Sequence, residues 1–174
     1  EAAISGADLV IFGIPSSFLR ATAKLAAPYL YAPMVIVNTG KGLEAGTHYT
    51  MSQILQEELP HLPIVTITGP SHAEEVARNV PTTVVAASKD LQAAEYVQKT
   101  MSSETLRLYR NSDIIGCEVG GALKNIIALS AGICDGLGCG DNTKAALMTR
   151  GMAEIVRVGL KLGGKIETFL GLTG

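Results

Sequence analysis

The sequence contains no tryptophan, and aromatic residues make up only 5% of its 174 residues. Its three histidines show no spacing typical of metal ligands, so we assign no metal site. Lysine and arginine residues do not cluster, and the formal net charge is only −2. These absences argue against a nucleic-acid surface and against a polybasic patch for membrane binding.

Long apolar runs are also missing. No stretch of eighteen apolar residues is free of charge or of glycine and proline, which disfavours a membrane span. The first residues show no basic region followed by an apolar core, so we expect no secretory signal. The three cysteines, Cys117, Cys134 and Cys139, include no C-x-x-C pair, and we expect free thiols in a reducing cytoplasm. The chain begins without methionine and stops within a pattern, so we expect a piece of a longer protein.

Hydrophobic residues make up 47% of the chain, and they occur in a regular order. Short β-rich runs alternate with helical patterns, which predicts βαβ units, a mostly parallel sheet and the α/β fold class. Ligands of such sheets bind at the carboxyl ends of the strands, where three loops at 13–17, 38–42 and 68–72 lie. The β-rich runs are 9–13, 34–38, 64–68, 82–88 and 106–109.

After Asn111 the strand patterns stop and two long helical segments follow, at 118–135 and at about 142–162. We therefore predict a domain boundary here, with an α/β domain over 1–112 and the first helices of an all-helical domain over 113–174. Spacings of three and four predict one packed face on the second helix. That face comprises Ala145, Met148, Met152, Ile155, Gly159 and Leu162.

Lys124 is the single charged residue between Glu118 and Asp135. An ammonium group in an apolar segment is costly unless it is paired or gives up its proton. Two interpretations follow. Lys124 is either a functional lysine or a buried structural lysine paired with Glu118 or Asp135.

Two of the loops also contain polar candidates. In "NTGKG", glycines flank Lys41, so the backbone can approach a ligand and the lysine can meet an anionic group. The alternative is a solvated loop lysine. In "TGPSHAEE", Ser71 and Glu74 form a capping-box pattern, which predicts a helix that starts at Ser71. Its N-terminus can hold a phosphate or a hydroxyl-bearing ligand, or can be capped and nothing more.

Taken in order, six stretches of the sequence resemble the NAD(P)-dependent glycerol-3-phosphate dehydrogenases, especially their bacterial branch. The resemblance extends from Leu9 to Gly174, essentially the whole chain. The stretches are "GIPSSF", "NTGKGLE", "TGPSHAEEVA", "PTTVVAAS", "VGGALKNIIALSAGICDGLGCGDNTKAAL" and "TRGMAEIVRVGLKLGG".

The resemblance implies a Rossmann-like nucleotide-binding domain and a helical substrate domain. It implies an enzyme that interconverts sn-glycerol 3-phosphate and dihydroxyacetone phosphate with NAD or NADP, in glycerophospholipid synthesis. It also implies a cytoplasmic homodimer.

The resemblance assigns roles to seven residues of this chain. Lys124, in "GALKN", is implied as the catalytic acid or base and as a substrate contact. Lys41 is implied to touch both substrate and cofactor. The remaining roles are substrate binding by Gly69, Ser71 and Asn125, and cofactor binding by Phe18 and Ala73.

The chain departs from the family pattern in two respects. His72 stands where many members have phenylalanine, which the bacterial branch accepts. The glycine-rich cofactor loop is expected before residue 1, and a later aspartate and an Arg/Asn phosphate-binding motif are expected after Gly174. We therefore expect this 174-residue chain to be inactive alone, with part of the Rossmann-like sheet missing from its N-terminal side.

Two alternatives remain open from the sequence. One is another two-domain dehydrogenase, acting on a hydroxyacid or a sugar acid; "NTGKG" together with "TGPSHAEE" favours glycerol 3-phosphate. The other is a non-catalytic scaffold or dimerisation piece. Retention of both Lys41 and Lys124 argues against the scaffold, whereas the absence of the glycine-rich loop argues for it.

Overall fold

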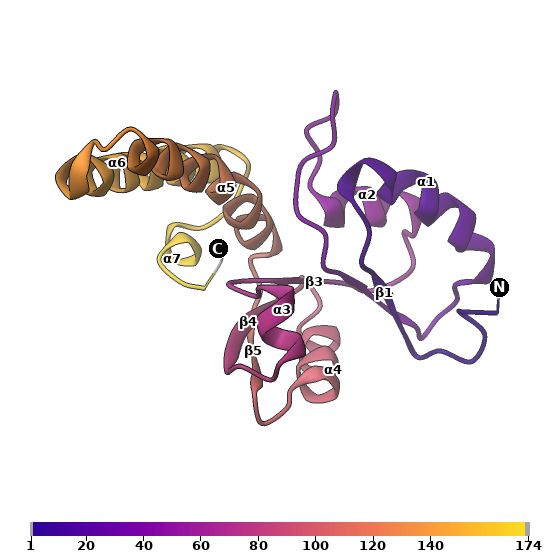
Figure 1. Ribbon diagram of the computed structural model, residues 1–174. Helices are drawn as coiled ribbons and strands as arrows, with labels where there is room; N and C mark the ends of the chain where they lie inside the picture. The colour runs from indigo at the N-terminus through magenta and orange to yellow at the C-terminus, as the bar shows by residue number, and fades with distance from the viewer. Residues whose placement is uncertain (1, 173–174) are drawn as a thin grey trace.

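The computed structural model describes residues 2–172, which form a five-stranded sheet followed by a group of helices (Figure 1). The strands lie side by side in chain order. They are β1 (Leu9–Phe12), β2 (Val35–Asn38), β3 (Ile64–Thr68), β4 (Thr82–Ala87) and β5 (Leu106–Asn111). All five β-rich runs of the sequence are strands, with ends shifted by at most two residues.

Strand direction changes once across the sheet. β1 pairs with β2, β2 with β3, and β4 with β5 in parallel, whereas β3 and β4 are antiparallel, with Thr68 opposite Val85. The predicted mostly parallel α/β sheet is confirmed. Because of the antiparallel pair, the carboxyl ends of β1, β2 and β3 share one edge, and those of β4 and β5 lie at the other.

Helices cover both faces of the sheet, because side chains of successive strand residues point to opposite faces. On one face, helices α1 (Ser16–Ala26) and α2 (Met51–Glu58) bury an apolar core against the first three strands. On the other face, α4 (Leu91–Met101) packs on alternate residues such as Val65 and Val84. The short helices η1 (Ala27–Tyr29) and α3 (Ala73–Ala77) lie in connections.

The chain after β5 is helical, as predicted. Helices α5 (Ile114–Gly136) and α6 (Gly140–Lys161) lie side by side, and α7 (Ile166–Phe169) packs on both. α5 starts earlier than the sequence pattern suggested, because the Asp113 carboxylate accepts a hydrogen bond from the Gly116 N–H and caps the helix. A domain division at residue 112 remains a prediction.

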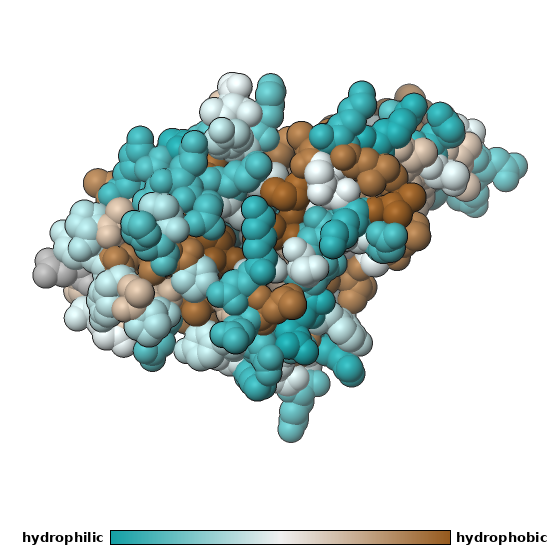
Figure 2. Space-filling model, turned by 180° about the vertical axis from the view of Figure 1, so that it is seen from behind, coloured by the Kyte–Doolittle hydropathy of each residue, from teal (hydrophilic) through white to brown (hydrophobic). Residues whose placement is uncertain are grey.

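Much of this helical hairpin is exposed. α5 is buried from Gly116 to Gly121, but Ile126 and Leu129 beyond it are 59% and 68% exposed. The apolar segment around Lys124 is therefore buried only in its first half. On α6, the predicted packed face holds at Ile155 and Gly159. It is wrong for the other four residues, which are exposed: Ala145, Met148, Met152 and Leu162. Figure 2 shows apolar surface over this part of the molecule.

Within residues 2–172, α5 is the one helix long and apolar enough to cross a membrane by length and composition, with 39% of its apolar window buried. Core helices of soluble proteins meet the same criterion, so this is weak evidence. The absence of a membrane span stays a prediction from the sequence.

Candidate active site

Glu118 attaches the first half of α5 to the sheet. Glu118 is 5% exposed, and its carboxylate accepts hydrogen bonds from the Ser52 N–H (2.9 Å), the Ser52 hydroxyl (2.5 Å) and the Thr66 hydroxyl (2.8 Å). Ser52 belongs to α2 and Thr66 to β3, so one side chain joins three elements. Burial raises the pKa of Glu118, and these hydrogen bonds oppose the rise.

Neither carboxylate considered as a partner for Lys124 pairs with it in the described chain. Glu118 is occupied by α2 and β3, and Asp135 forms an ion pair of 2.8 Å with Lys144 on α6. The interpretation of Lys124 as a structural lysine paired with one of them is therefore wrong. Periodicity alone could not exclude it, because the true partners of Glu118 lie more than fifty residues away in the chain.

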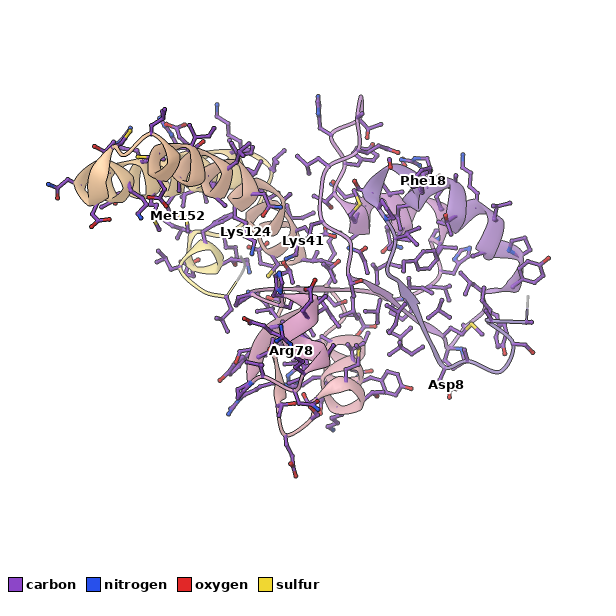
Figure 3. All side chains as sticks on the ribbon, viewed as in Figure 1. Asp8, Phe18, Lys41, Arg78, Lys124 and Met152 are labelled. Carbon is purple, nitrogen blue, oxygen red and sulfur yellow. The ribbon has the colours of Figure 1, made fainter. Side chains whose placement is uncertain are left out.

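Lys124 and Lys41 lie close together, although they come from different parts of the chain (Figure 3). Lys124 is half-buried on α5, on the C-terminal side of Glu118, the residue that joins this helix to α2 and β3. The pKa of Lys41 is lowered, first by burial of its ammonium group and second by the positive charge of Lys124. The Lys41 ammonium also donates to the Gly69 carbonyl at 3.3 Å. The site therefore has two ammonium groups at the carboxyl edge of β2 and β3.

The Lys41 loop is shaped by Asn38, a residue whose role the sequence motif did not indicate. Asn38 is fully buried at the end of β2, where its side-chain amide donates to the Gly40 carbonyl (2.9 Å) and its oxygen accepts from the Gly40 N–H (3.0 Å). Gly42 follows with φ of +140°, a conformation that side chains rarely adopt. An asparagine at the end of a strand and two residues before a glycine is a turn signal, and could have identified this role.

Gly69 brings the third loop close to β4. It is buried with φ of +140°, and a Cβ there would lie 3.0 Å from the Val84 Cα. Its carbonyl accepts from the Lys41 ammonium and, at 3.3 Å, from the Ser71 hydroxyl. Glycine is needed here because both the backbone conformation and the space exclude a side chain.

The predicted capping box at Ser71 is wrong. α3 begins at Ala73 with His72 at its N-cap, and no side-chain cap is present in this described helix. The Ser71 hydroxyl is bound to Gly69 instead, and the Glu74 carboxylate pairs with His72 Nδ1 at 3.0 Å. The helix is five residues long, which gives it little capacity to bind a ligand at its end.

The three other predicted site residues are exposed at the surface. Asn125 is exposed next to Lys124, and Ala73 is exposed at the start of α3. Phe18 is 62% exposed on α1, and Figure 3 shows it set apart from both lysines. The structure therefore brings Lys41, Lys124, Gly69 and Ser71 to one region, and leaves Phe18 outside it.

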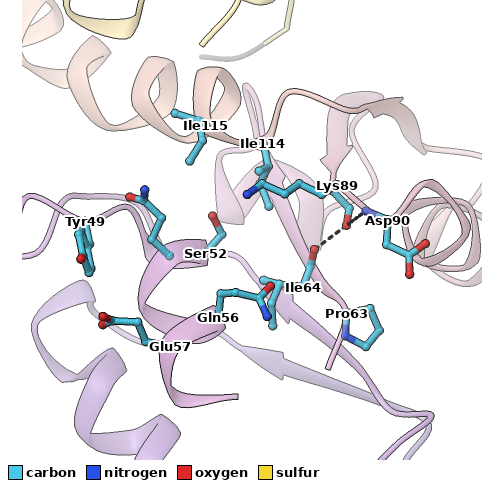
Figure 4. A pocket seen from close by; sticks show the side chains of 12 residues that line it. Tyr49, Ser52, Gln56, Glu57, Pro63, Ile64, Lys89, Asp90, Ile114 and Ile115 are labelled. Atoms are coloured by element: carbon cyan, nitrogen blue, oxygen red, sulfur yellow. Dashed lines mark hydrogen bonds between the residues drawn. The ribbon is translucent and has the colours of Figure 1, made fainter. Parts of the chain in front are cut away.

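Two cavities border α5. One, of about 460 Å³, lies between α5, α6 and α7; Lys124 is its charged lining residue and the rest of the lining is mostly apolar, including Ile127 and Met148. The other, of about 360 Å³, lies between α2, the start of β3, the β4–α4 loop and the start of α5 (Figure 4). None of the predicted site residues lines the second cavity.

This arrangement has defined chemical capacities. Two ammonium groups attract an anionic ligand, and a lysine amine held beside that ligand can exchange a proton with it. A mostly parallel sheet of this kind binds its ligands at the carboxyl ends of its strands, which is where the two lysines lie.

Sequence comparison identifies the family. The N-terminal part of the NAD-dependent glycerol-3-phosphate dehydrogenase family matches residues 1–94, and its C-terminal part matches residues 113–174. The chain therefore belongs to the NAD-dependent glycerol-3-phosphate dehydrogenase family.

Individual relatives agree with this assignment. A glycerol-3-phosphate dehydrogenase [NAD(P)+] of Clostridium perfringens is 52% identical over 174 residues, which cover all of this chain and 53% of the relative. The corresponding protein of Moorella thermoacetica is 58% identical, over 99% of this chain and 51% of its own. The crystal structure of glycerol-3-phosphate dehydrogenase from Coxiella burnetii superposes with a TM-score of 0.93 at 37% identity, covering 99% of this chain and 53% of that one. The chain spans about half the length of the relatives that it matches.

Proposed function

We propose that the protein interconverts sn-glycerol 3-phosphate and dihydroxyacetone phosphate with NAD or NADP, as part of a complete glycerol-3-phosphate dehydrogenase. The observation that carries this proposal is the pairing of Lys41 and Lys124 at the carboxyl edge of the sheet. A phosphorylated three-carbon substrate is an anion, and its carbinol oxygen must lose or gain a proton when the adjacent carbon loses or gains a hydride.

Lys124 acts on that proton in this proposal. A half-buried amine on a helix attached by Glu118 has a fixed position, and it can accept the carbinol proton or return it. Lys41 supplies fixed positive charge beside it, and its contact with the Gly69 carbonyl holds the ammonium over the third loop. The cavity between α5, α6 and α7 has a mostly apolar lining, which does not suit a phosphate. We therefore place the substrate between Lys124 and Lys41, outside that cavity.

The residues present fit one end of a nicotinamide cofactor. The loop is tightly packed at Gly40 and Gly42, where a Cβ would approach other atoms to about 3.0 Å. This packing keeps Lys41 at the edge of the sheet where nicotinamide cofactors bind. The bound cofactor would supply the hydride chemistry. Lys41, Ala73 and Phe18 are our proposed contacts with it. The sequence has no G-x-G-x-x-G turn for its pyrophosphate.

Replacement of Lys124 tests the assignment. In the full-length enzyme, Lys124→Met should lower turnover at saturating substrate by about 100-fold or more, because proton transfer loses its group. A matched control is Lys99→Met on α4, whose side chain is 73% exposed and pairs with Glu95 at the surface; we expect it to leave turnover unchanged. Turnover of Lys124→Met within a few-fold of wild type, with an intact fold by circular dichroism, would refute the role.

The remaining elements of the proposal rest on the family resemblance. We propose a cytoplasmic homodimer that acts in glycerophospholipid synthesis, with Gly69, Ser71 and Asn125 at the substrate. Sedimentation of the full-length enzyme tests the dimer; a monomer at all concentrations would exclude it.

A further inference from the structure

The connection between α5 and α6 brings two thiols together. Cys134 is 7% exposed in the last turn of α5, and Cys139 is exposed at the N-cap of α6. The Cys139 N–H donates to the Cys134 carbonyl at 3.1 Å, and the Gly138 N–H donates to the Asp135 carbonyl at 3.0 Å. Gly138 has φ of +66°. Together these are the hydrogen bonds and the left-handed glycine of a Schellman motif.

This motif explains why the two side chains meet. A Schellman motif places the residue after its glycine against the residue at the start of the helix's last turn, commonly in an apolar contact. Here both positions are cysteines, and the Cys139 side chain lies close enough to influence the Cys134 thiol. Burial, followed by this contact, raises the pKa of Cys134.

The third thiol has a different environment. Cys117 lies on α5 and is fully buried against β4, and its pKa is raised to about 12, first by burial and then by the charges of Asp113 and Glu118. A thiol of this kind is inert towards electrophiles and disulfides. It serves as an internal reference for the other two.

We propose that Cys134 and Cys139 form a thiol–disulfide pair, a modification site that reacts with small-molecule disulfides such as glutathione disulfide. The inference does not depend on the proposed enzymatic function. Cys139 is the first to react because it is exposed, and Cys134 lies next to it to complete the exchange. Along α5 the pair is about 15 Å from Lys124, at about 1.5 Å of rise per residue, so it is separate from the lysine site.

The exchange balances in two steps. The Cys139 sulfur, as thiolate, attacks glutathione disulfide, forms a mixed disulfide and releases one glutathione thiolate. The Cys134 thiol then loses its proton, its sulfur attacks the Cys139 sulfur, and a second glutathione thiolate leaves. The two thiolates take up the two protons, so the protein is oxidised by two electrons and glutathione disulfide is reduced to two glutathiones.

Peptide mass spectrometry tests the proposal directly. The protein, in the longest form that the gene encodes, is equilibrated with mixtures of reduced and oxidised glutathione, denatured, alkylated with N-ethylmaleimide and cut with trypsin. Cleavage after Lys124 and Lys144 releases one peptide, 125–144, that contains both Cys134 and Cys139. Cys117 is released separately in peptide 111–124. We expect peptide 125–144 to become unlabelled and lighter by two hydrogens, while Cys117 remains fully labelled.

Two comparisons separate a structured pair from two cysteines that are merely close in sequence. In urea-unfolded protein, the glutathione ratio needed for half oxidation should be at least about tenfold more oxidising, because the folded turn holds the sulfurs in position. In Cys139→Ser, Cys134 should stay reduced and labelled. Equal oxidation of folded and unfolded protein would overturn the proposal, and so would a stable mixed disulfide on Cys139 with Cys134 still labelled.

Discussion

Replacement of Glu118 by alanine is expected to lower the free energy of unfolding by about 3–5 kcal/mol, a large part of the stability of a domain of this size. Glu118 is 5% exposed, and its carboxylate accepts three hydrogen bonds from Ser52 and Thr66. Each donor left buried without an acceptor costs about 1–3 kcal/mol, and the cavity adds to this loss. We keep to the lower end for the hydroxyls, because the Ser52 hydroxyl also contacts the Thr50 hydroxyl at 3.2 Å.

The variant Glu118→Gln removes the negative charge of the side chain but keeps its shape. The amide oxygen can retain the bonds from the Ser52 N–H and the Thr66 hydroxyl, and the amide nitrogen can donate to the Ser52 hydroxyl oxygen. We therefore expect a loss of only about 1 kcal/mol at acidic pH. Glutamine does not titrate, so this variant also isolates the pH dependence that the carboxyl group causes.

The sign of that pH dependence follows from the raised pKa. Burial raises the pKa of Glu118 above its ordinary value of 4.5, so the folded chain binds this proton more tightly than the unfolded chain. The contribution to stability is complete below pH 4.5 and is lost as the pH rises through the folded-state pKa. Relative to wild type, Glu118→Gln should therefore become more stable as the pH rises.

Urea unfolding followed by circular dichroism, at several pH values from about 4 to about 8, measures both effects. The matched control is Glu75→Ala, an exposed carboxylate on α3, with an expected change within about 0.5 kcal/mol. If Glu118→Ala lost less than about 1 kcal/mol, the hydrogen-bonded attachment would be refuted. Parallel pH curves for wild type and Glu118→Gln would refute the titration argument.

Three further predictions concern the lysine site, the helical hairpin and the chain as a whole. Lys41→Ala should raise the Michaelis constant and lower turnover of the full-length enzyme, and Lys41→Arg should recover part of both because charge matters there more than pKa; no recovery by arginine would contradict this role. Gly159→Ala should lower the free energy of unfolding by about 1–3 kcal/mol in urea, because a Cβ would overlap the buried Phe169 ring, and an unchanged midpoint would show that the ring can move freely. Calorimetric titration of the 174-residue chain with NADH and with NADPH should show no binding, because it has no G-x-G-x-x-G turn, while the full-length enzyme binds; a micromolar Kd for the chain alone would contradict it.

The first three strands were predictable because each is a short, largely apolar run followed by turn residues, as in "MVIVN" before a glycine loop. Their pairing directions were not. A strand has the same period of two in parallel and antiparallel pairs, so nothing in β4 itself indicates that it runs opposite to β3.

The lysine site was predictable to a similar extent. Lys41 and Lys124 were identifiable from their unusual neighbours and from the family resemblance, but the attachment that positions Lys124 was not. Glu118 binds Ser52 and Thr66 across 66 and 52 residues of chain, a distance at which sequence patterns carry little information. Ser71 failed as a cap for a different reason: the local pattern was present, but the helix begins at Ala73 with His72 as its N-cap, so Ser71 lies one residue too early.

Because α5 is an unbroken helix from Glu118 to Lys124, it fixes both the distance and the rotation between these two residues. A residue inserted between them would turn Lys124 by about 100° about the helix axis and advance it by about 1.5 Å, away from Lys41. A deletion would turn it the other way. Evolution can therefore vary the side chains along this stretch, but it cannot vary their number. Length is the constrained quantity here, and we expect insertions and deletions in α5 to be confined to the region beyond Lys124.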